Sequence, residues 1–140
     1  MHHIIYMSRA AHPMSDNDLE FILRQARLNN EQRNITGALA YGDGQFMQIM
    51  EGEKADLDAV YEVVSRDPRH KGLTKLADKE ISQRSFSDWS MAFQTLSPEQ
   101  FYELAGYTAP NELNEQAHNL SAADNLLFQM MNTFGLTQRA

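Results

Sequence analysis

One stretch, residues 44–52, constrains the fold of this chain more than any other. Its sequence is Gly-Gln-Phe-Met-Gln-Ile-Met-Glu-Gly, a strand-length apolar segment with a glycine at each end. Side chains of a strand alternate between its two faces, so Phe46, Gln48 and Met50 share one face. The other face is apolar as well. We therefore expect a central strand of a sheet that is covered on both sides.

Gln48 is the exception on its face, because it places a primary amide among apolar side chains. A buried amide has two donors and an acceptor, and leaving them unpaired costs about 1–3 kcal/mol. Two interpretations follow. In the first, Gln48 is satisfied without a ligand, either by backbone groups in the core or by water at the rim, as buried polar groups usually are. In the second, Gln48 faces a polar ligand.

Composition narrows the class of protein. The chain has 140 residues, 42% hydrophobic and 22% charged, which is typical of one globular domain. It has no cysteine, so disulfides, thiol catalysis and cysteine metal sites are excluded, and the five histidines show no metal spacing. The net charge of −7 argues against nonspecific nucleic-acid binding. Without an apolar run of membrane-spanning length or a signal peptide, we expect a cytoplasmic protein with no membrane contact.

The hydrophobic pattern predicts the order strand, helix, strand, strand, helix, strand, strand, then helices. The predicted strands cover residues 3–8, 35–41, 44–52 and 73–81, and a short last strand carries Trp89, Met91 and Phe93 in alternation. One predicted helix begins at Ser15 and a second covers residues 53–66. Three further helices are predicted to begin at Ser97, near Asn111 and at Ser121. The first six elements match a ferredoxin-like α+β sandwich, and the last strand completes the order βαββαββ, with two helices on one face of a mixed sheet. We expect residues 1–94 to form the sandwich. Residues 95–140 should be a helical extension of the same compact unit, packed on the other face.

Three polar side chains converge in that topology. The first and third strands are antiparallel neighbours, so Tyr6 and Gln48, each near the middle of its strand, can point together toward the two helices. Asn30 continues the apolar stripe of the first helix beyond Ala26 and approaches the same space. Alternatively, Asn29 or Asn30 ends that helix, since asparagine tolerates the left-handed conformation. Three converging polar groups favour a ligand pocket over a satisfied core.

Several short motifs occur in a fixed order between residues 4 and 93. They are Tyr6-x-Ser8, Asn30, Ile35-Thr36-Gly37, Phe46-Met47-Gln48 leading to Glu51-Gly52, Asp67-x-Arg69-His70, Arg84-x-Phe86 and Trp89-Ser90-Met91. Each motif alone is weak, but their joint order and spacing resemble the BLUF domains, blue-light sensors that use FAD. The resemblance implies a ferredoxin-like sandwich that holds the flavin between its two helices, at the pocket described above.

The resemblance also implies roles for single residues. Tyr6 matches the tyrosine that donates an electron and a proton to the excited flavin. Gln48 matches the glutamine that bridges tyrosine and flavin, and its hydrogen bonds rearrange so that the flavin absorption shifts to the red. Asn30 matches the asparagine that holds the edge of the flavin ring. Trp89 and Met91 match the mobile strand that carries the signal.

The cofactor implied by the resemblance is FAD, with FMN and riboflavin as alternatives. The flavin-contacting set is Tyr6, Ser8, Ile22, Asn29, Asn30, Gln48, Arg66, Asp67, Arg69 and His70. Val63 departs from the family, because some relatives have a basic residue there, near the flavin and its phosphates. Arg66 or Arg69 is expected to take that role.

We therefore expect a short, single-domain blue-light photoreceptor that is not an enzyme and has no effector domain of its own. Residues 1–94 are then the photosensory domain. The region from Thr95 onward has five acids against Arg139 alone, a net charge of −4. Output should pass through these residues to an unidentified protein partner or through a homo-oligomer.

Two other classes of protein remain open. The first is a ferredoxin-like regulatory module that binds a small ligand without light chemistry. The second is a small hydrolase of the acylphosphatase type, but the segment Arg9-Ala10-Ala11 is a poor anion-binding loop. A triad of Ser8, His70 and Asp67 is also conceivable, although Asp67 and His70 fit a local cap at a helix end better.

Overall fold

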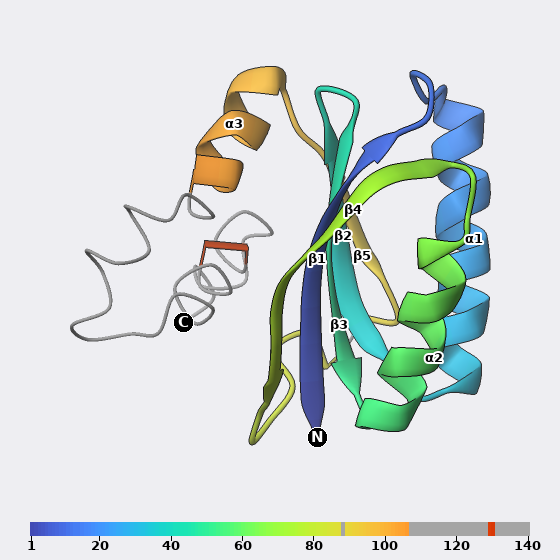
Figure 1. The fold of residues 1–140 in the computed structure, drawn as a ribbon, viewed down its shortest axis with the longest axis vertical. Coiled ribbons are helices and arrows are strands. Elements are labelled where there is room, and N and C mark those ends of the chain that lie inside the picture. Colours follow the sequence, from blue (N-terminus) through green and yellow to red (C-terminus); the bar gives the residue numbers. More distant parts are fainter. Residues whose placement is uncertain (88, 107–128, 131–140) are drawn as a thin grey trace. The chain divides into compact units, whose positions relative to one another are not determined.

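A mixed β-sheet organises the part of the chain that the computed structural model describes, residues 1–87, 89–106 and 129–130. Within those residues the sheet has five strands in the order β4-β1-β3-β2-β5 (Figure 1). The elements are β1 His2–Ala10, α1 Asp16–Gln32, β2 Thr36–Gly42, β3 Gln45–Gly52, α2 Lys54–Ser65, β4 His70–Glu80, β5 Ala92–Thr95 and α3 Pro98–Gly106. β2 and β5 are parallel, and the other neighbouring strands are antiparallel. This is the predicted ferredoxin-like α+β sandwich.

β3 is the central strand, as the alternation of residues 44–52 predicted. Phe46 and Met50 on one face and Met47 and Ile49 on the other are all fully buried. Its neighbour β1 is antiparallel, and the register places Tyr6 directly opposite Gln48. A sheet with both faces covered fixes its register strongly, because a slip of one residue would move every side chain to the wrong face.

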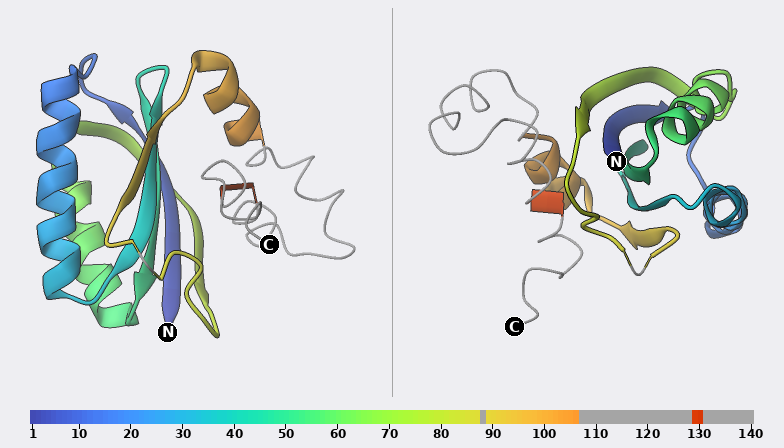
Figure 2. Two further views of the ribbon diagram at one scale, coloured as in Figure 1. Left: turned by 180° about the vertical axis from the view of Figure 1, so that it is seen from behind. Right: turned by 90° about the horizontal axis from the view of Figure 1, so that it is seen from below.

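Both α1 and α2 cover the same face of the sheet, as Figures 1 and 2 show from three directions. α1 begins at the expected cap: the Asp18 amide donates to Ser15 Oγ, and the Ser15 amide donates to Asp18 Oδ2. Under α1 lies an apolar cluster of the sheet that includes Leu39 and Phe46, and under α2 lies a second that includes Ile4. The space between the two clusters holds the candidate site.

The last strand is shorter than predicted, and this part of the prediction is wrong. β5 begins at Ala92, so Trp89 and Met91 precede it and do not alternate on a strand. Before Ala92, side chains of α1 take the place of strand partners at two carbonyls, while the preceding carbonyl, that of Trp89, accepts from the Gly37 amide of β2 at 3.1 Å. Arg27 donates to the Met91 carbonyl and Asn30 to the Ser90 carbonyl, and the parallel ladder with β2 starts only afterwards.

The chain divides into two compact units, Met1–Thr95 and Leu96–Ala140. In the second, α3 has the predicted capping box, in which the Ser97 amide donates to Gln100 Oε1 and the Gln100 amide donates to Ser97 Oγ. The helices predicted near Asn111 and at Ser121 lie outside the described residues, except that residues 129–130 are helical. The predicted packing of residues 95–140 likewise stays a prediction. No helix in the described part of the chain has both the length and the apolar character that crossing a membrane requires.

Gly37 provides a test of how closely β2 and β3 pack. A Cβ atom at this position would lie 2.0 Å from the carbonyl oxygen of Ile49, which is backbone and cannot move aside. Gly37→Ala should lower the free energy of unfolding by about 3 kcal/mol or more, measured by urea denaturation. Gly44→Asn is the control: Gly44 has φ +70 with nothing near its missing Cβ, and asparagine adopts that conformation readily. A loss below about 1 kcal/mol in Gly37→Ala would contradict the packing described.

Candidate functional site

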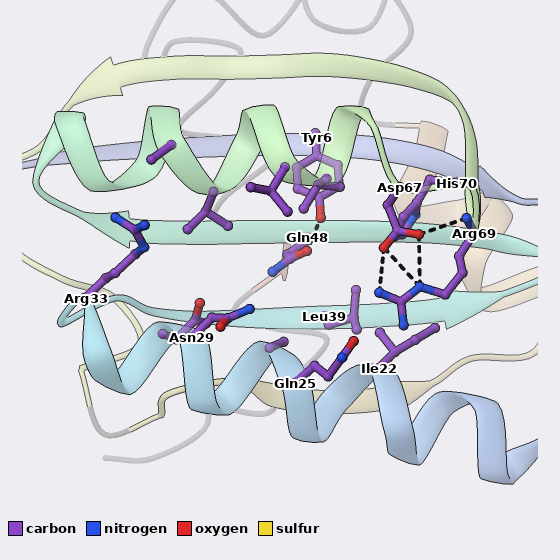
Figure 3. Close-up of a pocket in the computed structure, with 16 residues that line it drawn as sticks. Tyr6, Ile22, Gln25, Asn29, Arg33, Leu39, Gln48, Asp67, Arg69 and His70 are labelled. Atoms are coloured by element: carbon purple, nitrogen blue, oxygen red, sulfur yellow. Dashed lines mark hydrogen bonds and ion pairs between the residues drawn. The ribbon is translucent and has the colours of Figure 1, made fainter.

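A pocket of about 270 Å³ lies between α1, α2 and the sheet (Figure 3). Its volume is near the lower end of the roughly 300–1,000 Å³ typical of small-molecule sites. Aliphatic side chains form its walls, and polar side chains line its floor and ends. The lining residues are Tyr6, Ile22, Gln25, Ala26, Asn29, Asn30, Arg33, Leu39, Gln48, Ala59, Val60, Val63, Val64, Asp67, Arg69 and His70.

Tyr6 and Gln48 form the floor of the pocket and are bonded to each other. The Tyr6 hydroxyl donates to Gln48 Oε1, and both residues are buried. On its other side, Gln48 Nε2 lies 3.8 Å from Met91 Sδ, so the amide stands between a phenol and a thioether. The structure therefore places Met91, which the resemblance assigned to the signalling segment, in contact with Gln48.

The Tyr6 hydroxyl is held in its protonated form. Burial raises the pKa of Tyr6 well above its usual value, and the nearby Tyr61 and Asp67 act in the same direction. The Tyr61 ring meets the Tyr6 ring edge-on, with centroids 5.7 Å apart. Tyr6 is therefore a fixed hydrogen-bond donor toward Gln48 at neutral pH.

Asn30 reaches the pocket from α1, as its position on the helical stripe indicated. It is 1% exposed, and its Nδ2 donates to the Ser90 carbonyl at 2.6 Å. The alternative interpretation, that Asn29 or Asn30 ends the helix, is wrong. α1 continues to Gln32, and it is Asn34, with φ 56, that takes the left-handed conformation after the helix.

Asp67, Arg69 and His70 form one end of the pocket, and Arg33 stands at the other (Figure 3). Arg69 Nε donates to both carboxylate oxygens of Asp67, at 3.0 and 2.9 Å. Burial raises the pKa of Asp67, but the hydrogen bonds from Arg69 outweigh it and hold that pKa below its usual range. This end of the pocket therefore presents an ion pair.

Ser8 and His70 are neighbours, but they do not form a hydrolase triad with Asp67. Ser8 Oγ and His70 Nδ1 share a hydrogen bond of 2.8 Å. A triad instead needs the serine on Nε2 and the acid on Nδ1. The Asp67 carboxylate is instead bonded to the Arg69 side chain.

The structure places most of the predicted site residues on the pocket lining, with four exceptions, of which Met91 lies outside the lining but contacts Gln48. Ser8 does not line the pocket and contacts it only through His70. Arg66 lies outside it because its guanidinium bonds Glu62 one turn back on α2, at 2.6 Å, with its side chain 78% exposed. Trp89 is also outside the lining and is 38% exposed.

Several further residues line the pocket that were not predicted, although helical spacing could have found them. On α1, Gln25 and Arg33 continue the face of Ile22 and Asn29 at intervals of three and four residues. On α2, Val60 and Val64 share one face with Val63, whose position was expected near the flavin, and this face leads to Asp67. Extending each stripe to the helix end would have identified both walls.

The fold and the pocket define a small α+β domain that holds a ligand with flat apolar faces and polar edges. Residues 1–92 match the model of the BLUF family, described as sensors of blue-light using FAD. The chain belongs to this family.

Similar proteins point in the same direction. Photoactivated adenylate cyclase subunit alpha of Euglena gracilis is 41% identical over 83 residues, 59% of this chain, but the chain spans only 8% of that relative. Among solved structures, BlrB, a BLUF protein in its dark state, has a TM-score of 0.70 and 26% identity, covering 94% of this chain and 96% of that one. BlsA in its photo-activated state has a TM-score of 0.72 and 27% identity, covering 91% and 92%.

The residues of the pocket fit the flavin that this family binds. A flavin ring is flat, and aliphatic side chains of the lining such as Ile22 and Val60 would suit its faces. Its polar edge needs amide partners, and Asn29, Asn30 and Gln48 lie on the pocket lining. Alanines at positions 26 and 59 keep the space between the helices open. The protein is thus a flavin-binding blue-light sensor domain.

His70 gives the pocket a defined dependence on pH. Burial lowers the pKa of His70 below its ordinary value of about 6.5, against the opposing charge of Asp67. As pH falls through 6.5, the imidazole of His70 binds a proton more readily in the unfolded chain than in the folded pocket. The free energy of unfolding therefore falls.

We expect His70→Gln to reduce that loss between pH 7 and 5 by up to about 1.4 kcal/mol per pH unit, measured by urea denaturation with flavin in fixed excess. The exposed His12 provides the control, His12→Gln. Equal pH slopes in wild type and His70→Gln would contradict a resisted proton at this site.

Proposed function

We propose that the Tyr6–Gln48 hydrogen bond converts absorbed blue light into a change of structure, and that Met91 is the first group to respond. The observation that carries the proposal is the chain of contacts from the Tyr6 hydroxyl through the Gln48 amide to the Met91 thioether, on the floor of the flavin pocket. Family membership favours this function over a small-ligand module without light chemistry.

The bound flavin supplies a strong oxidant when it absorbs blue light. Tyr6 is the phenol that lines its pocket, and an oxidised phenol is strongly acidic. The hydroxyl proton then has one path out, along the hydrogen bond to Gln48 Oε1. Tyr6 recovers its electron and its proton within the cycle, so the protein undergoes no net oxidation and turns over no substrate.

The change caused by light then persists as a change in the hydrogen bonds of the Gln48 amide. In the structure its Oε1 faces Tyr6 and its Nε2 faces Met91. Rotation or tautomerisation of the amide changes which group it presents to the ring edge, and a new donor there shifts the flavin absorption to the red. Met91 is unbranched and adaptable, so it can follow the amide at low cost.

The two ends of the pocket suggest how the rest of the cofactor is held. Arg69 is the basic residue that we propose for the phosphate contacts, because it lines the pocket whereas Arg66 does not. Arg33, at the opposite end, is the alternative. A phosphate contact at either position would distinguish FAD and FMN, which carry phosphate, from riboflavin, which does not.

We further propose that the signal passes from Met91 through β5 to residues 95–140, and from there to a protein partner in the cytoplasm or to a homo-oligomer. In this proposal residues 1–140 are a sensor and carry no enzymatic activity. The excess of acids from Thr95 onward supports a partner contact. The name of the Euglena relative, which couples light to an adenylate cyclase, supports the idea of a downstream partner.

Tyr6→Phe tests the electron and proton donor directly. The ring still fills its place in the core, so flavin content should stay close to that of wild type, while the reversible red shift under blue light is abolished. Absorption spectra before and after illumination provide the measurement. Tyr61→Phe, which removes a hydroxyl from the ring packed on Tyr6, should keep the shift. A full photocycle in Tyr6→Phe would exclude Tyr6 as the donor.

A further inference from the structure

We propose that Arg27 is a positioning residue for the light reaction: its guanidinium fixes the Met91 backbone on α1 and thereby keeps the Met91 thioether against the Gln48 amide. This inference deepens the proposed function and rests on it for its kinetic consequence. Its structural half, that Arg27 holds the segment before β5, stands on contacts of its own.

Arg27 makes a forked contact with the backbone. Its Nε and Nη2 donate to the Met91 carbonyl at 3.2 and 3.0 Å. One turn further along α1, Asn30 donates to the carbonyl of Ser90 at 2.6 Å. Two consecutive carbonyls are therefore held by side chains of one helix. Both carbonyls precede Ala92, where the pairing with β2 begins. The two side chains therefore supply the hydrogen bonds that a neighbouring strand would otherwise supply.

The start of the same segment, residues 81–91, is fixed independently. The buried Glu51 carboxylate accepts the amides of Ser85 and Phe86 at 2.6 and 2.9 Å. Arg84 donates to the backbone carbonyls of Asn34 and Glu51, at 2.7 and 2.9 Å. These anchors lie on β3 and in the turn between α1 and β2. Loss of Arg27 should therefore loosen the Met91 end of the segment while its beginning stays in place.

The position of the Met91 backbone matters because of the contact that its side chain makes. A thioether is a weak acceptor, and in the structure it faces the amide nitrogen of Gln48. If the amide rotates, its oxygen faces the sulfur, and two acceptors then meet. While Arg27 holds its backbone, Met91 can avoid this contact only by rotating its own side chain. The Arg27 contact therefore disfavours the rotated state of the Gln48 amide. Loss of the Arg27 contact should stabilise the rotated state of the amide.

The forked geometry explains why this position needs arginine. A guanidinium presents several donors in a fixed plane, so two N–H groups can reach one carbonyl. A lysine at position 27 keeps the charge but offers a single flexible ammonium. Arg27→Lys should therefore restore only part of what Arg27→Met removes. Arg24 is a matched control, because it lies on the same helix, is 69% exposed on its side chain and bonds Glu20, away from the segment.

The first measurement is hydrogen exchange of the flavin-loaded protein in the dark. Arg27→Met should speed exchange of the amides around residues 89–93 by roughly tenfold or more, the factor expected for loss of a charge-assisted hydrogen bond. Arg27→Lys should fall between wild type and Arg27→Met. Arg24→Met should match wild type. Unchanged exchange in Arg27→Met would overturn the inference that Arg27 holds the Met91 backbone.

The second measurement is the return of the red-shifted state in the dark after a blue-light pulse. Arg27→Met should bind flavin and reach the full shift, but return on the order of tenfold more slowly, with Arg27→Lys between the two. A faster or unchanged return, together with faster exchange, would overturn the positioning role. If wild type shows no red shift, the proposed function fails, whereas the exchange measurement still decides whether Arg27 holds the Met91 backbone.

Discussion

The hydrogen bond between Tyr6 and Gln48 is the interaction on which the rest of the site depends. It joins two central antiparallel strands at residues that lie directly opposite in the register. Burying a phenol and an amide is costly unless they bond each other. The apolar residues that fill both faces of β3 fix the register, and the register in turn makes the bond. The Tyr6–Gln48 pair is therefore a consequence of how the sheet packs.

The amide of Gln48 is satisfied unequally on its two sides. Its oxygen accepts a hydrogen bond from a protonated phenol, whereas its nitrogen faces a sulfur, which is a weak acceptor. A strong acceptor in place of Met91 would hold the amide in one orientation. A thioether makes the alternative orientation accessible at low cost, and the segment that carries it is tied to the wall of the pocket by Asn30. In the mechanism that we propose, weak pairing at this point allows the amide to switch.

The features that the sequence predicted are those determined by local patterns. Alternation over residues 44–52 identified the central strand, and serine residues located the starts of two helices. Helical spacing predicted that Asn30 reaches the pocket of Tyr6 and Gln48. The failures have separate physical causes. The short final strand depends on side chains of Arg27 and Asn30, some 60 residues earlier, that bind the backbone before the ladder begins. No pattern near Trp89 could reveal them. Arg66 was expected at the flavin, but its contact with Glu62 on the exposed face of α2 removes it.

The central claim is that light changes the hydrogen bonding of the Gln48 amide. The most direct test is an NMR measurement of the Gln48 side-chain amide in ¹⁵N-glutamine-labelled protein, in the dark and under continuous blue light, with Gln48→Leu to assign the signal. The account predicts that this signal moves or broadens on illumination and returns together with the flavin absorption. A flavin that shifts to the red while the Gln48 signal stays unchanged would contradict it.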